Sequence, residues 1–310
     1  MNILSIAKYM LPMTRYPYTG RVVPCPVCEE PSFTPVAGID RRLKRLPTVM
    51  CDHCGLLYTN PMPTEAELGT YYEKYYRFDY QLAATAPKQK HIVKRRREAE
   101  GRAAQLDGLL EKGARTLDFG AGSGEFVALM LEKGFDAHGF EPGETYAGHA
   151  IGRLGSRIRQ TSWQEARYEA GFDLVTCFHV LEHLSTPMPA LRRMADWLRP
   201  GGKLYVEVPD LVGGLSHKGF GGLHFAHVLA FNHYNLALAA ARVGFRPVKV
   251  VKPTGVVFER GEVTPQEREE LAASGLSATR EHFVDNGPAA SYFTYQLAKV
   301  GLKLGVQRER

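Results

Sequence analysis

Residues 116–124 read Thr-Leu-Asp-Phe-Gly-Ala-Gly-Ser-Gly. The apolar residues predict a strand, the glycines Gly120, Gly122 and Gly124 predict a tight turn, and the apolar pattern that follows predicts a helix over 125–133. Glycine lets the backbone turn sharply, and it lets a ligand touch the main chain because no Cβ intervenes. The helix N-terminus adds free N–H groups. The stretch therefore predicts a binding site at a strand–turn–helix junction.

The spacing of these glycines distinguishes between two kinds of nucleotide site. A dinucleotide site carries G-x-G-x-x-G, and counting from Gly120 its third glycine would fall on Glu125. Two acidic residues flank the turn instead: Asp118 lies two residues before the first glycine, and Glu141 ends the next apolar run. A carboxylate at Asp118 suits a cationic ligand better than a pyrophosphate.

Residues 117–124 resemble motif I of the Rossmann-like S-adenosylmethionine (SAM)-dependent methyltransferases. Four further segments agree with that family in order and spacing, so that the resemblance covers about residues 113–250. They are Gly139–Pro142, Phe172–Val175 followed by Phe178–His183, Leu198–Gly202, and His227–Leu236 followed by Gly244–Phe245. The resemblance implies SAM as the cofactor and methyl transfer as the reaction.

The pattern along the chain predicts alternating strands and helices after residue 115. Strands are expected at 116–119, 136–140, 157–160, 172–177, 203–208, 246–251 and 255–260, and helices at 125–133, 144–154, 187–198 and 233–243. Such alternation predicts an α/β fold with a mostly parallel sheet and helices on both faces. Together with the resemblance it implies a Rossmann-like seven-stranded sheet, within a SAM-binding domain at 113–261.

In such sheets ligands bind beyond the carboxyl ends of the strands, which places Asp118, Glu141, Phe178 and Asp210 on one rim. The resemblance implies that Asp118 lies near the methionine ammonium group and that Glu141 holds the ribose hydroxyls. The backbone of Gly120, Gly122 and Gly124 would contact the cofactor. We further expect Trp163 to flank the adenine, with ordinary surface packing as its alternative, and Phe178 to line the site.

Two cysteine pairs, Cys25–Cys28 and Cys51–Cys54, are separated by 22 residues. Paired C-x-x-C knuckles at this spacing predict a tetrahedral zinc site, which four thiolates would close to water and substrate. The alternatives are a redox C-x-x-C, unligated thiols, or His53 as a substitute ligand. Cys177 lies in an apolar strand and is expected to be a small core residue. Residues 1–63 therefore read as a zinc-ribbon-like module with a structural metal.

Residues 64–112 are expected to form a helical lid or linker. Thr64 and Glu67 make a capping box at its start. The segment is rich in tyrosine, which indicates either packing or a lid with one or two phenols facing the substrate, and Tyr72 and Tyr76 are the candidates. Residues 88–112 read as a basic helix. Residues 262–310 are expected to be a C-terminal helical extension.

Two histidines are candidates for the group that accepts a proton from the methyl acceptor, because histidine titrates near neutral pH. The leading candidate is His227, since related sugar C-methyltransferases with a zinc module use a histidine at a similar place. There it follows His-Glu, whereas here Phe225-Ala226 precede it. His179 is the second candidate and is expected to face the cofactor methyl. The Gly- and His-rich loop 209–231 adds Asp210 and His224 as substrate contacts.

Residues 179–183, His-Val-Leu-Glu-His, also fit H-x-x-E-H, an inverted zinc-protease signature. The segment follows directly from a buried strand, and the same pattern is ordinary in the methyltransferases that the chain resembles. We therefore set the protease aside and expect His183 to be structural.

The chain carries a net charge of +6 and a pI of about 9.0. Its basic residues lie in short runs, which are mostly solvated faces. No stretch reaches the roughly 20 apolar residues of a membrane helix, and the N-terminus lacks the features of a secretory signal. We expect a cytoplasmic protein that binds a small molecule rather than nucleic acid.

The sequence thus predicts a SAM-dependent methyltransferase acting on a small molecule, a sugar or nucleotide-linked sugar, with O-methylation favoured over C-methylation. The first alternative is an RNA methyltransferase that uses the zinc module and the basic runs to grip nucleic acid. Against it, Cys177-Phe178-His179-Val180 stands where RNA methyltransferases carry an Asn-Pro-Pro-Tyr-like tetrapeptide. The second alternative is a non-catalytic scaffold, which the intact Asp118, glycines and Glu141 disfavour.

Overall fold

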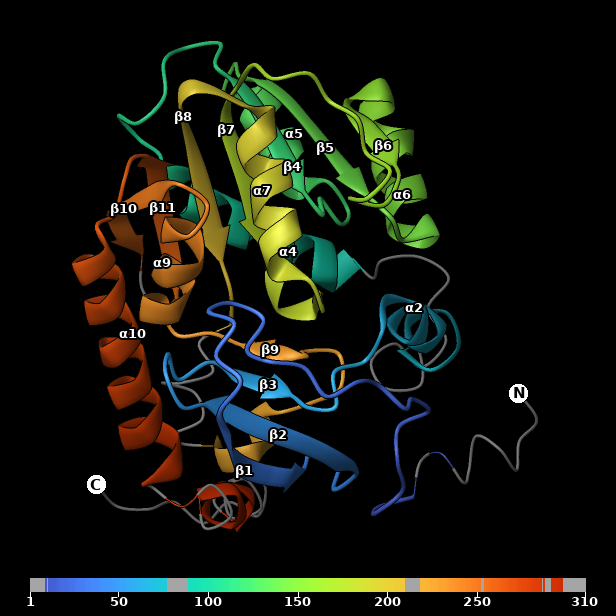
Figure 1. Ribbon diagram of the computed structural model, residues 1–310. Helices are drawn as coiled ribbons and strands as arrows, with labels where there is room; N and C mark the ends of the chain where they lie inside the picture. Colours follow the sequence, from blue (N-terminus) through green and yellow to red (C-terminus); the bar gives the residue numbers. More distant parts are fainter. Residues whose placement is uncertain are drawn as a thin grey trace, which may run out of the picture.

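The computed structural model describes residues 9, 11–76, 89–209, 218–251, 254–285, 287 and 291–297. Two sheets lie one above the other in Figure 1, a seven-stranded one carrying most of the helices and a four-stranded one below it. The tyrosine-rich segment beyond Tyr76, the start of the long loop at Asp210, and the chain beyond Leu297 lie outside the described residues.

The seven-stranded sheet has the order β10-β11-β8-β7-β4-β5-β6. Its strands are β4 (Arg115–Phe119), β5 (Asp136–Glu141), β6 (Ile158–Gln160), β7 (Phe172–Phe178), β8 (Leu198–Glu207), β10 (Phe245–Val251) and β11 (Gly255–Arg260). Strand β11 runs opposite to the other six strands, and all the remaining pairs are parallel. The expected α/β Rossmann-like sheet, seven-stranded and mostly parallel, is confirmed.

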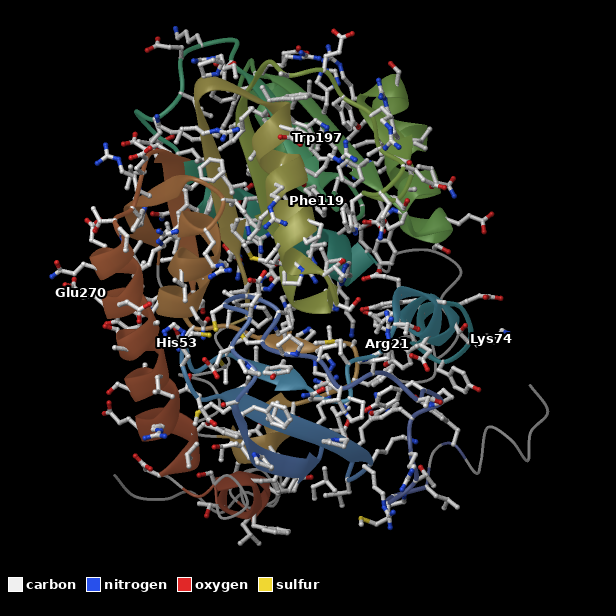
Figure 2. All side chains as sticks on the ribbon, in the orientation of Figure 1. Arg21, His53, Lys74, Phe119, Trp197 and Glu270 are labelled. Carbon is white, nitrogen blue, oxygen red and sulfur yellow. The ribbon has the colours of Figure 1, made fainter. Side chains whose placement is uncertain are left out.

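Helices connect these strands as the alternation predicts. They are α5 (Glu125–Glu132), α6 (Glu144–Leu154), α7 (Pro187–Trp197) and α9 (His233–Ala241), with short 3₁₀ turns η1 (Gly155–Arg157), η2 (Leu181–His183) and η3 (Gly219–Gly222). The strands and α7 bury large rings between them: the Phe119 and Trp197 ring centroids are 6.2 Å apart inside the domain (Figure 2). This core fixes the carboxyl ends of β4, β5 and β7 at one edge.

The four-stranded antiparallel sheet joins the two halves of the chain. It has the order β1 (Phe33–Ile39), β2 (Arg45–Cys51), β3 (Leu57–Thr59) and β9 (Leu229–Ala230). The last strand comes from the long loop after β8, and it pairs Leu57 with Ala230 and Tyr58 with Leu229. Figure 1 shows β9 lying beside β3 at the top of this sheet. The long loop therefore completes the N-terminal sheet.

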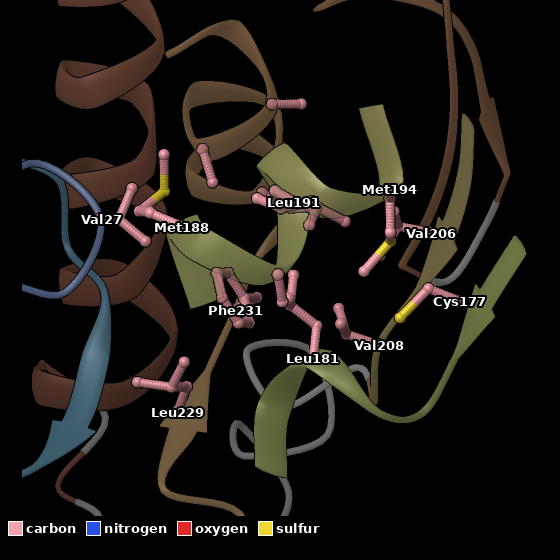
Figure 3. Close-up of a cluster of buried hydrophobic side chains, with 14 of the residues drawn as sticks. Val27, Cys177, Leu181, Met188, Leu191, Met194, Val206, Val208, Leu229 and Phe231 are labelled. Atoms are coloured by element: carbon pink, nitrogen blue, oxygen red, sulfur yellow. The ribbon is translucent and has the colours of Figure 1, made fainter. Parts of the chain in front are cut away.

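A continuous core runs through both sheets. Val27, in the turn between the first two cysteines, is fully buried in the same cluster as Leu181, Met188, Leu191 and Leu229 (Figure 3). An apolar residue at the tip of a cysteine turn thus packs on α7 rather than facing solvent. Burial of this kind contributes about 25 cal/mol per Å² of apolar surface removed from water.

Three further helices flank these sheets. Helix α2 (Glu65–Lys74) begins at Thr64 with the expected capping box, and α4 (Gln89–Ala104) packs against α5. The basic helix expected over 88–112 thus ends at Ala104. Helix α10 (Pro265–Thr279) packs on α9 and continues into a π-turn, η4 (Arg280–Val284), and residues 291–297 are helical. The expected domain boundaries remain predictions.

Among the described residues, we find no helix with the length and apolar character needed to cross a bilayer.

Candidate functional site

The glycine turn lies at the carboxyl end of β4, where the sequence places it. Gly120, Gly122 and Gly124 have φ values of 78°, 54° and 83°, a region that residues with a Cβ rarely adopt. A Cβ on Gly120 would lie 2.5 Å from Cγ2 of Val180. The turn therefore lies against the segment after β7, which carries His179, whereas His227 comes from the loop before β9.

Glu141, at the end of β5, closes over this turn. Its Oε2 accepts a hydrogen bond from the Gly122 N–H at 3.0 Å, and its Oε1 accepts one from the Gly143 N–H at 2.9 Å. Burial raises the pKa of Glu141, and these two backbone donors oppose the rise. Ionised carboxylate oxygens are acceptors only, with capacity for further donors. The pair of oxygens thus suits a donor such as a sugar hydroxyl.

Asp118 is buried at the end of β4, with 5% of its surface exposed. The Thr176 hydroxyl donates a hydrogen bond to its Oδ1 at 2.7 Å. Burial raises the pKa of Asp118 to about 6, while the Thr176 hydrogen bond and the charge of Arg102 act in the opposite direction. Burial disfavours the ionised form of the Asp118 carboxylate, and a cationic ligand beside it would stabilise that form.

Two other expected cofactor contacts lie in packed surroundings. The Phe178 ring packs edge-on against Phe126 and Tyr205, with centroids 4.9 Å away in each case. The Arg102 guanidinium stacks 4.4 Å from the centre of the same ring. Trp163 is partly buried after β6, and its Nε1 has no hydrogen-bond partner among the described residues. Phe178 is therefore enclosed by protein rather than open on the rim.

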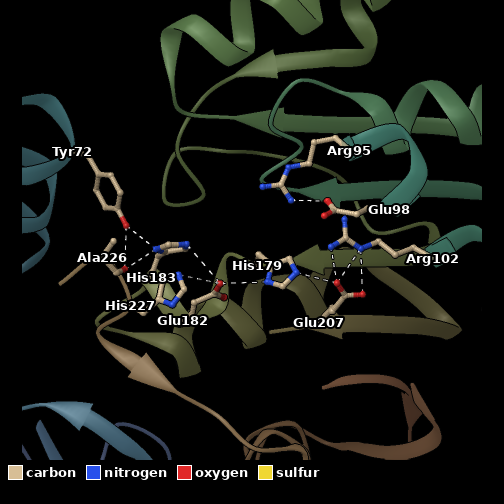
Figure 4. A network of polar contacts seen from close by, with 10 residues as sticks. All are labelled: Tyr72, Arg95, Glu98, Arg102, His179, Glu182, His183, Glu207, Ala226 and His227. Atoms are coloured by element: carbon tan, nitrogen blue, oxygen red, sulfur yellow. Dashed lines mark hydrogen bonds and ion pairs between the residues drawn. The ribbon is translucent and has the colours of Figure 1, made fainter. Parts of the chain in front are cut away.

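A cluster of histidines surrounds one buried carboxylate beyond β7 (Figure 4). We call Glu182 and the rings of His179, His183, His224 and His227 the histidine cluster. Nitrogens of His179, His183 and His227 lie 3.7, 3.6 and 3.9 Å from Oε1 of Glu182. The His227 ring contacts those of His183 and His224, at centroid separations of 4.7 and 3.8 Å. The structure thus gathers both catalytic candidates at one point.

The two candidates differ in charge. Burial lowers the pKa of His227 well below its ordinary value, with the neighbouring histidines and Arg41 adding to the effect, so the ring is neutral at pH 7. Burial also acts to lower the pKa of His179, but Glu182 and Glu207 outweigh it and raise the pKa to about 9. The His179 Nε2 lies 3.0 Å from Oε1 of Glu207. His179 is therefore a cation at pH 7, and its protonated ring cannot accept a further proton.

Three of the four expected substrate contacts lie at or beside the histidine cluster. The Tyr72 hydroxyl is 2.8 Å from Nδ1 of His183, and the ring of Tyr76 lies 5.2 Å from that of Tyr72. His224 contacts His227, as described above. Asp210, the fourth, lies outside the described residues.

The four cysteines of the knuckles come together as the spacing predicts. Their sulfurs all lie within 4.8 Å of one another, with 3.7 Å between Cys25 and Cys54 and 3.4 Å between Cys28 and Cys51. A tetrahedron with Zn–S bonds of about 2.3 Å has edges of about 3.8 Å. His53 turns to Glu269 on α10, with 3.0 Å between Nε2 and Oε2. The donor set therefore fits zinc without His53.

The sequence analysis missed three charged groups of the site. Glu207 ends β8 and binds the guanidinium of Arg102, at 2.6 Å from Nη2 to Oε1, as well as His179. Glu182 lies in a segment that carries the family resemblance and fits H-x-x-E-H, but neither pattern assigns it a role. Arg102 comes from α4, where it is one of several basic residues and lies outside every motif. Glu207 could have been found because an acidic residue follows the apolar run Leu204–Val206 in the expected strand.

A family model described as a methyltransferase domain matches residues 91–250. The chain belongs to this family. The match covers the glycine turn, Glu141 and the histidine cluster, and the prediction of a SAM-dependent methyltransferase is confirmed for this domain. Because the two carboxylates and the glycine backbone fit a cationic nucleoside, the residues present are those that would hold SAM.

Several known proteins share this domain. The chain is 30% identical over 167 residues to a tRNA U34 carboxymethyltransferase of Idiomarina loihiensis, covering 48% of the chain and 50% of the relative. It is 34% identical over 108 residues to a ubiquinone biosynthesis O-methyltransferase of Vibrio parahaemolyticus, covering 33% and 45%. The chain thus spans about half the length of the curated relatives it matches.

Among solved structures, one similar to this chain is the 1,6-didemethyltoxoflavin-N1-methyltransferase of Burkholderia thailandensis. It is 20% identical, with a TM-score of 0.47, and covers 67% of this chain and 96% of its own.

Proposed function

We propose that this chain transfers the methyl group of SAM to a small molecule, a sugar or nucleotide-linked sugar, with O-methylation favoured over C-methylation. One observation carries the proposal: the glycine turn bridged by Glu141 lies against Val180, and the segment of Val180 bears His179, Glu182 and His183 of the histidine cluster. A methyl donor on the turn and an acceptor at the cluster would then be neighbours.

The cofactor brings a methyl group on a positively charged sulfur, so the protein's task is chiefly to position the reactants. Glu141 would accept hydrogen bonds from the ribose hydroxyls, while the glycines would let the cofactor lie close to the backbone. Asp118 would pair with the methionine ammonium group. Trp163 beside the adenine remains a proposal of the same kind, supported by its place after β6.

His227 is the group of this cluster to which we assign the acceptor's proton. Its ring is neutral at pH 7, whereas His179 already carries its proton. His179 would instead orient Glu182 and Glu207, between which it lies. Replacing His227 by alanine is expected to lower kcat by 10²-fold or more, as for other general bases.

The acceptor side of the site suits a polar molecule with a negative charge. Tyr72, Tyr76 and His224 offer hydrogen-bonding groups on aromatic rings, as sugar binding requires. The charge of Arg41, from the turn after β1, is among the causes that lower the pKa of His224 and His227. A phosphate of a nucleotide-linked sugar would be attracted to the same charge.

A screen of nucleotide-linked sugars, free sugars and transfer RNA with labelled SAM tests this function. We expect label in a nucleotide-linked sugar, and loss of that label with His227→Ala. Label in transfer RNA alone would contradict the small-molecule proposal.

An RNA acceptor is the second candidate, because one relative modifies transfer RNA. The basic residues of α4 argue against it, since most of them already have acidic partners. Lys94 and Arg95 pair with Glu98, and Arg96 pairs with Glu100 and Glu132. We therefore expect only weak, non-specific RNA binding, which salt abolishes. Tight RNA binding in gel shifts would revive this candidate.

Zinc at the four cysteines is part of the same proposal. Four thiolates leave no open coordination position, so the ion would be structural. Its support is the sulfur geometry and the burial of Cys25, Cys51 and Cys54.

A further inference from the structure

We propose that Glu182, His183 and His227 bind a divalent first-row metal ion beside the methyl acceptor, at a site separate from the four cysteines. The inference rests on the proposed function and deepens it, because an ion there would contact the acceptor's oxygens. With the ion bound, the His227 ring would be a ligand, and the acceptor hydroxyl, made more acidic by the ion, would lose its proton to solvent water. His227 would then accept the proton only in the metal-free chain.

The first observation is an orphaned carboxylate. Glu182 is fully buried, and neither of its oxygens has a hydrogen-bond partner among the described residues. The imidazole nitrogens around Oε1 stand 3.6 to 3.9 Å away, too far for hydrogen bonds. The cationic His179 ring lies 3.7 Å from Oε1 without donating a hydrogen bond to it, and burying a carboxylate without hydrogen-bond donors is costly. A cation between these groups would satisfy the oxygen and the nitrogens together.

The second observation is the orientation of His183. Its Nδ1 lies 2.6 Å from the carbonyl oxygen of Ala226, to which the Tyr72 hydroxyl also donates at 3.3 Å. Nδ1 therefore carries the hydrogen, and the lone pair of Nε2 is left on the side of Glu182. Histidines that bind metals are held in this way, by a carbonyl or carboxylate on the other ring nitrogen.

The third observation is the spacing of the donor atoms. One oxygen of Glu182 and one nitrogen each of His183 and His227 lie within 4.8 Å of one another. At the tetrahedral angle, metal–ligand bonds of about 2.1 Å separate two donors by about 3.4 Å, close to the 3.6 Å between Nε2 of His183 and Oε1 of Glu182. Figure 4 shows the two rings on the same side of the carboxylate.

The donor set specifies the class of ion. Two imidazoles and one carboxylate suit zinc, iron, manganese, cobalt or nickel better than magnesium or calcium, which prefer oxygen ligands. Three protein ligands leave coordination positions open. An acceptor with two neighbouring oxygens, such as a sugar diol, would fill them, and the ion would make its hydroxyl more acidic.

The test is a Co²⁺ titration, followed by absorption, of the full-length chain loaded with one equivalent of zinc for the four cysteines. We expect one further equivalent to bind, with weak ligand-field bands and without the intense charge-transfer bands of thiolate ligands. Glu182→Gln preserves the shape of the side chain and should weaken Co²⁺ binding at least tenfold. His183→Asn should do the same. His138→Gln, a histidine on β5 that pairs with Asp136, is the matched control and should bind like the parent chain.

Two results would overturn the site: no second equivalent in the folded parent chain, or equal Co²⁺ affinity in Glu182→Gln. Calorimetry with S-adenosylhomocysteine separates this outcome from failure of the proposed function. Cofactor binding and metal-independent methyl transfer without Co²⁺ uptake would leave the function and remove the ion. Co²⁺ uptake in a chain that binds no cofactor would support the ion site and contradict the proposed function.

Discussion

Three buried or half-buried carboxylates of the domain differ in what surrounds them. Asp118 has one hydroxyl donor, Glu141 has two backbone donors from the glycine turn and the start of α6, and Glu182 has no hydrogen bond among the described residues. Since a carboxylate's chemistry follows its donors and its burial, the three are suited to different positive or hydrogen-bonding partners. Each can be tested by replacing a single residue.

Replacing Glu141 by alanine tests the ribose contact. The variant loses the acceptors for the cofactor hydroxyls, and hydrogen bonds to charged groups contribute about 1.5–3 kcal/mol. We therefore expect SAM affinity, measured by calorimetry, to fall at least tenfold. Glu144→Ala, in the exposed first turn of α6, is the control and should bind normally. Unchanged affinity in a folded Glu141→Ala protein would refute the contact.

The raised pKa of Asp118 predicts a pH dependence of cofactor binding. In the free protein the carboxyl prefers its neutral form below about pH 6. Pairing with an ammonium group requires the ionised form, so SAM affinity should fall as the pH drops below about 6. The sign for stability is opposite: because the pKa is above its ordinary 3.8, the free protein loses stability as the pH rises from about 4 to about 6.

Calorimetry between pH 5 and 8 measures this linkage. Asp118→Asn should bind weakly and remove the dependence. Thr176→Val removes the donor that favours the ionised carboxylate and should move the transition to higher pH. A parent chain whose affinity is the same at pH 5 and pH 7 would contradict the assignment of Asp118.

At the scale of elements, the second cysteine knuckle is held against α10. Gly55 ends the knuckle with a φ of 69°, and a Cβ there would lie 2.5 Å from the carbonyl oxygen of Gly275. His53 pairs with Glu269 one and a half turns earlier on the same helix, and this partner is the main reason that the pKa of His53 is raised to about 9. The backbone of the second cysteine knuckle thus lies directly against the backbone of α10.

Gly55→Ala tests this contact without changing a cysteine. The left-handed backbone costs about 1–2 kcal/mol for a residue with a Cβ, and overpacking adds about 1–3 kcal/mol. We expect a loss of at least 2 kcal/mol in the free energy of unfolding, measured with urea. Gly38→Ala, whose Cβ would meet nothing within 4 Å, should change stability little. Equal stability of the two variants would show that α10 does not hold the knuckle.

The alternation of apolar runs predicted each strand of the seven-stranded sheet and the helices between them, because these elements bury their own sequence patterns. The strand β9 could not be predicted in this way. It has two residues and depends on β3, which lies some 170 positions earlier. The strand expected at 203–208 begins earlier, because Leu198–Gly202, one of the segments that carry the resemblance, is itself the start of β8, with Leu198 paired to Phe172.

The site residues also divide into those with local sequence motifs and those that depend on distant contacts. Asp118, the glycines, Glu141 and the cysteines could be located because their motifs are local in sequence. Arg102, Glu207 and Glu182 could not be assigned roles, because their chemistry comes from contacts between distant elements. Likewise, the charges of His179 and His227 depend on burial and on Glu182 and Glu207, which the sequence does not reveal.

At the scale of the molecule, the N-terminal module and the methyltransferase domain share a sheet and a core. The cysteine turns, β3, β9 and α7 contribute to the same apolar cluster. A module built in this way is not expected to unfold alone. Binding of structural zinc contributes about 10–16 kcal/mol in small zinc domains, as much as the whole stability of a typical domain.

Cys25→Ser together with Cys28→Ser should therefore remove the metal and destabilise the entire chain. We expect metal analysis to show one zinc fewer per chain, and thermal unfolding to occur in a single transition at a temperature lower by 10 °C or more. Cys177→Ser, in β7, should keep the zinc. Two separate transitions, with the cofactor domain unaffected, would contradict the shared core.

The most direct test of the account is a crystal structure of the full chain with S-adenosylhomocysteine. It should show the ribose hydroxyls on Glu141, the amino group next to Asp118, and the sulfur facing the histidine cluster. A cofactor bound elsewhere, or a glycine turn that holds a dinucleotide instead, would contradict it.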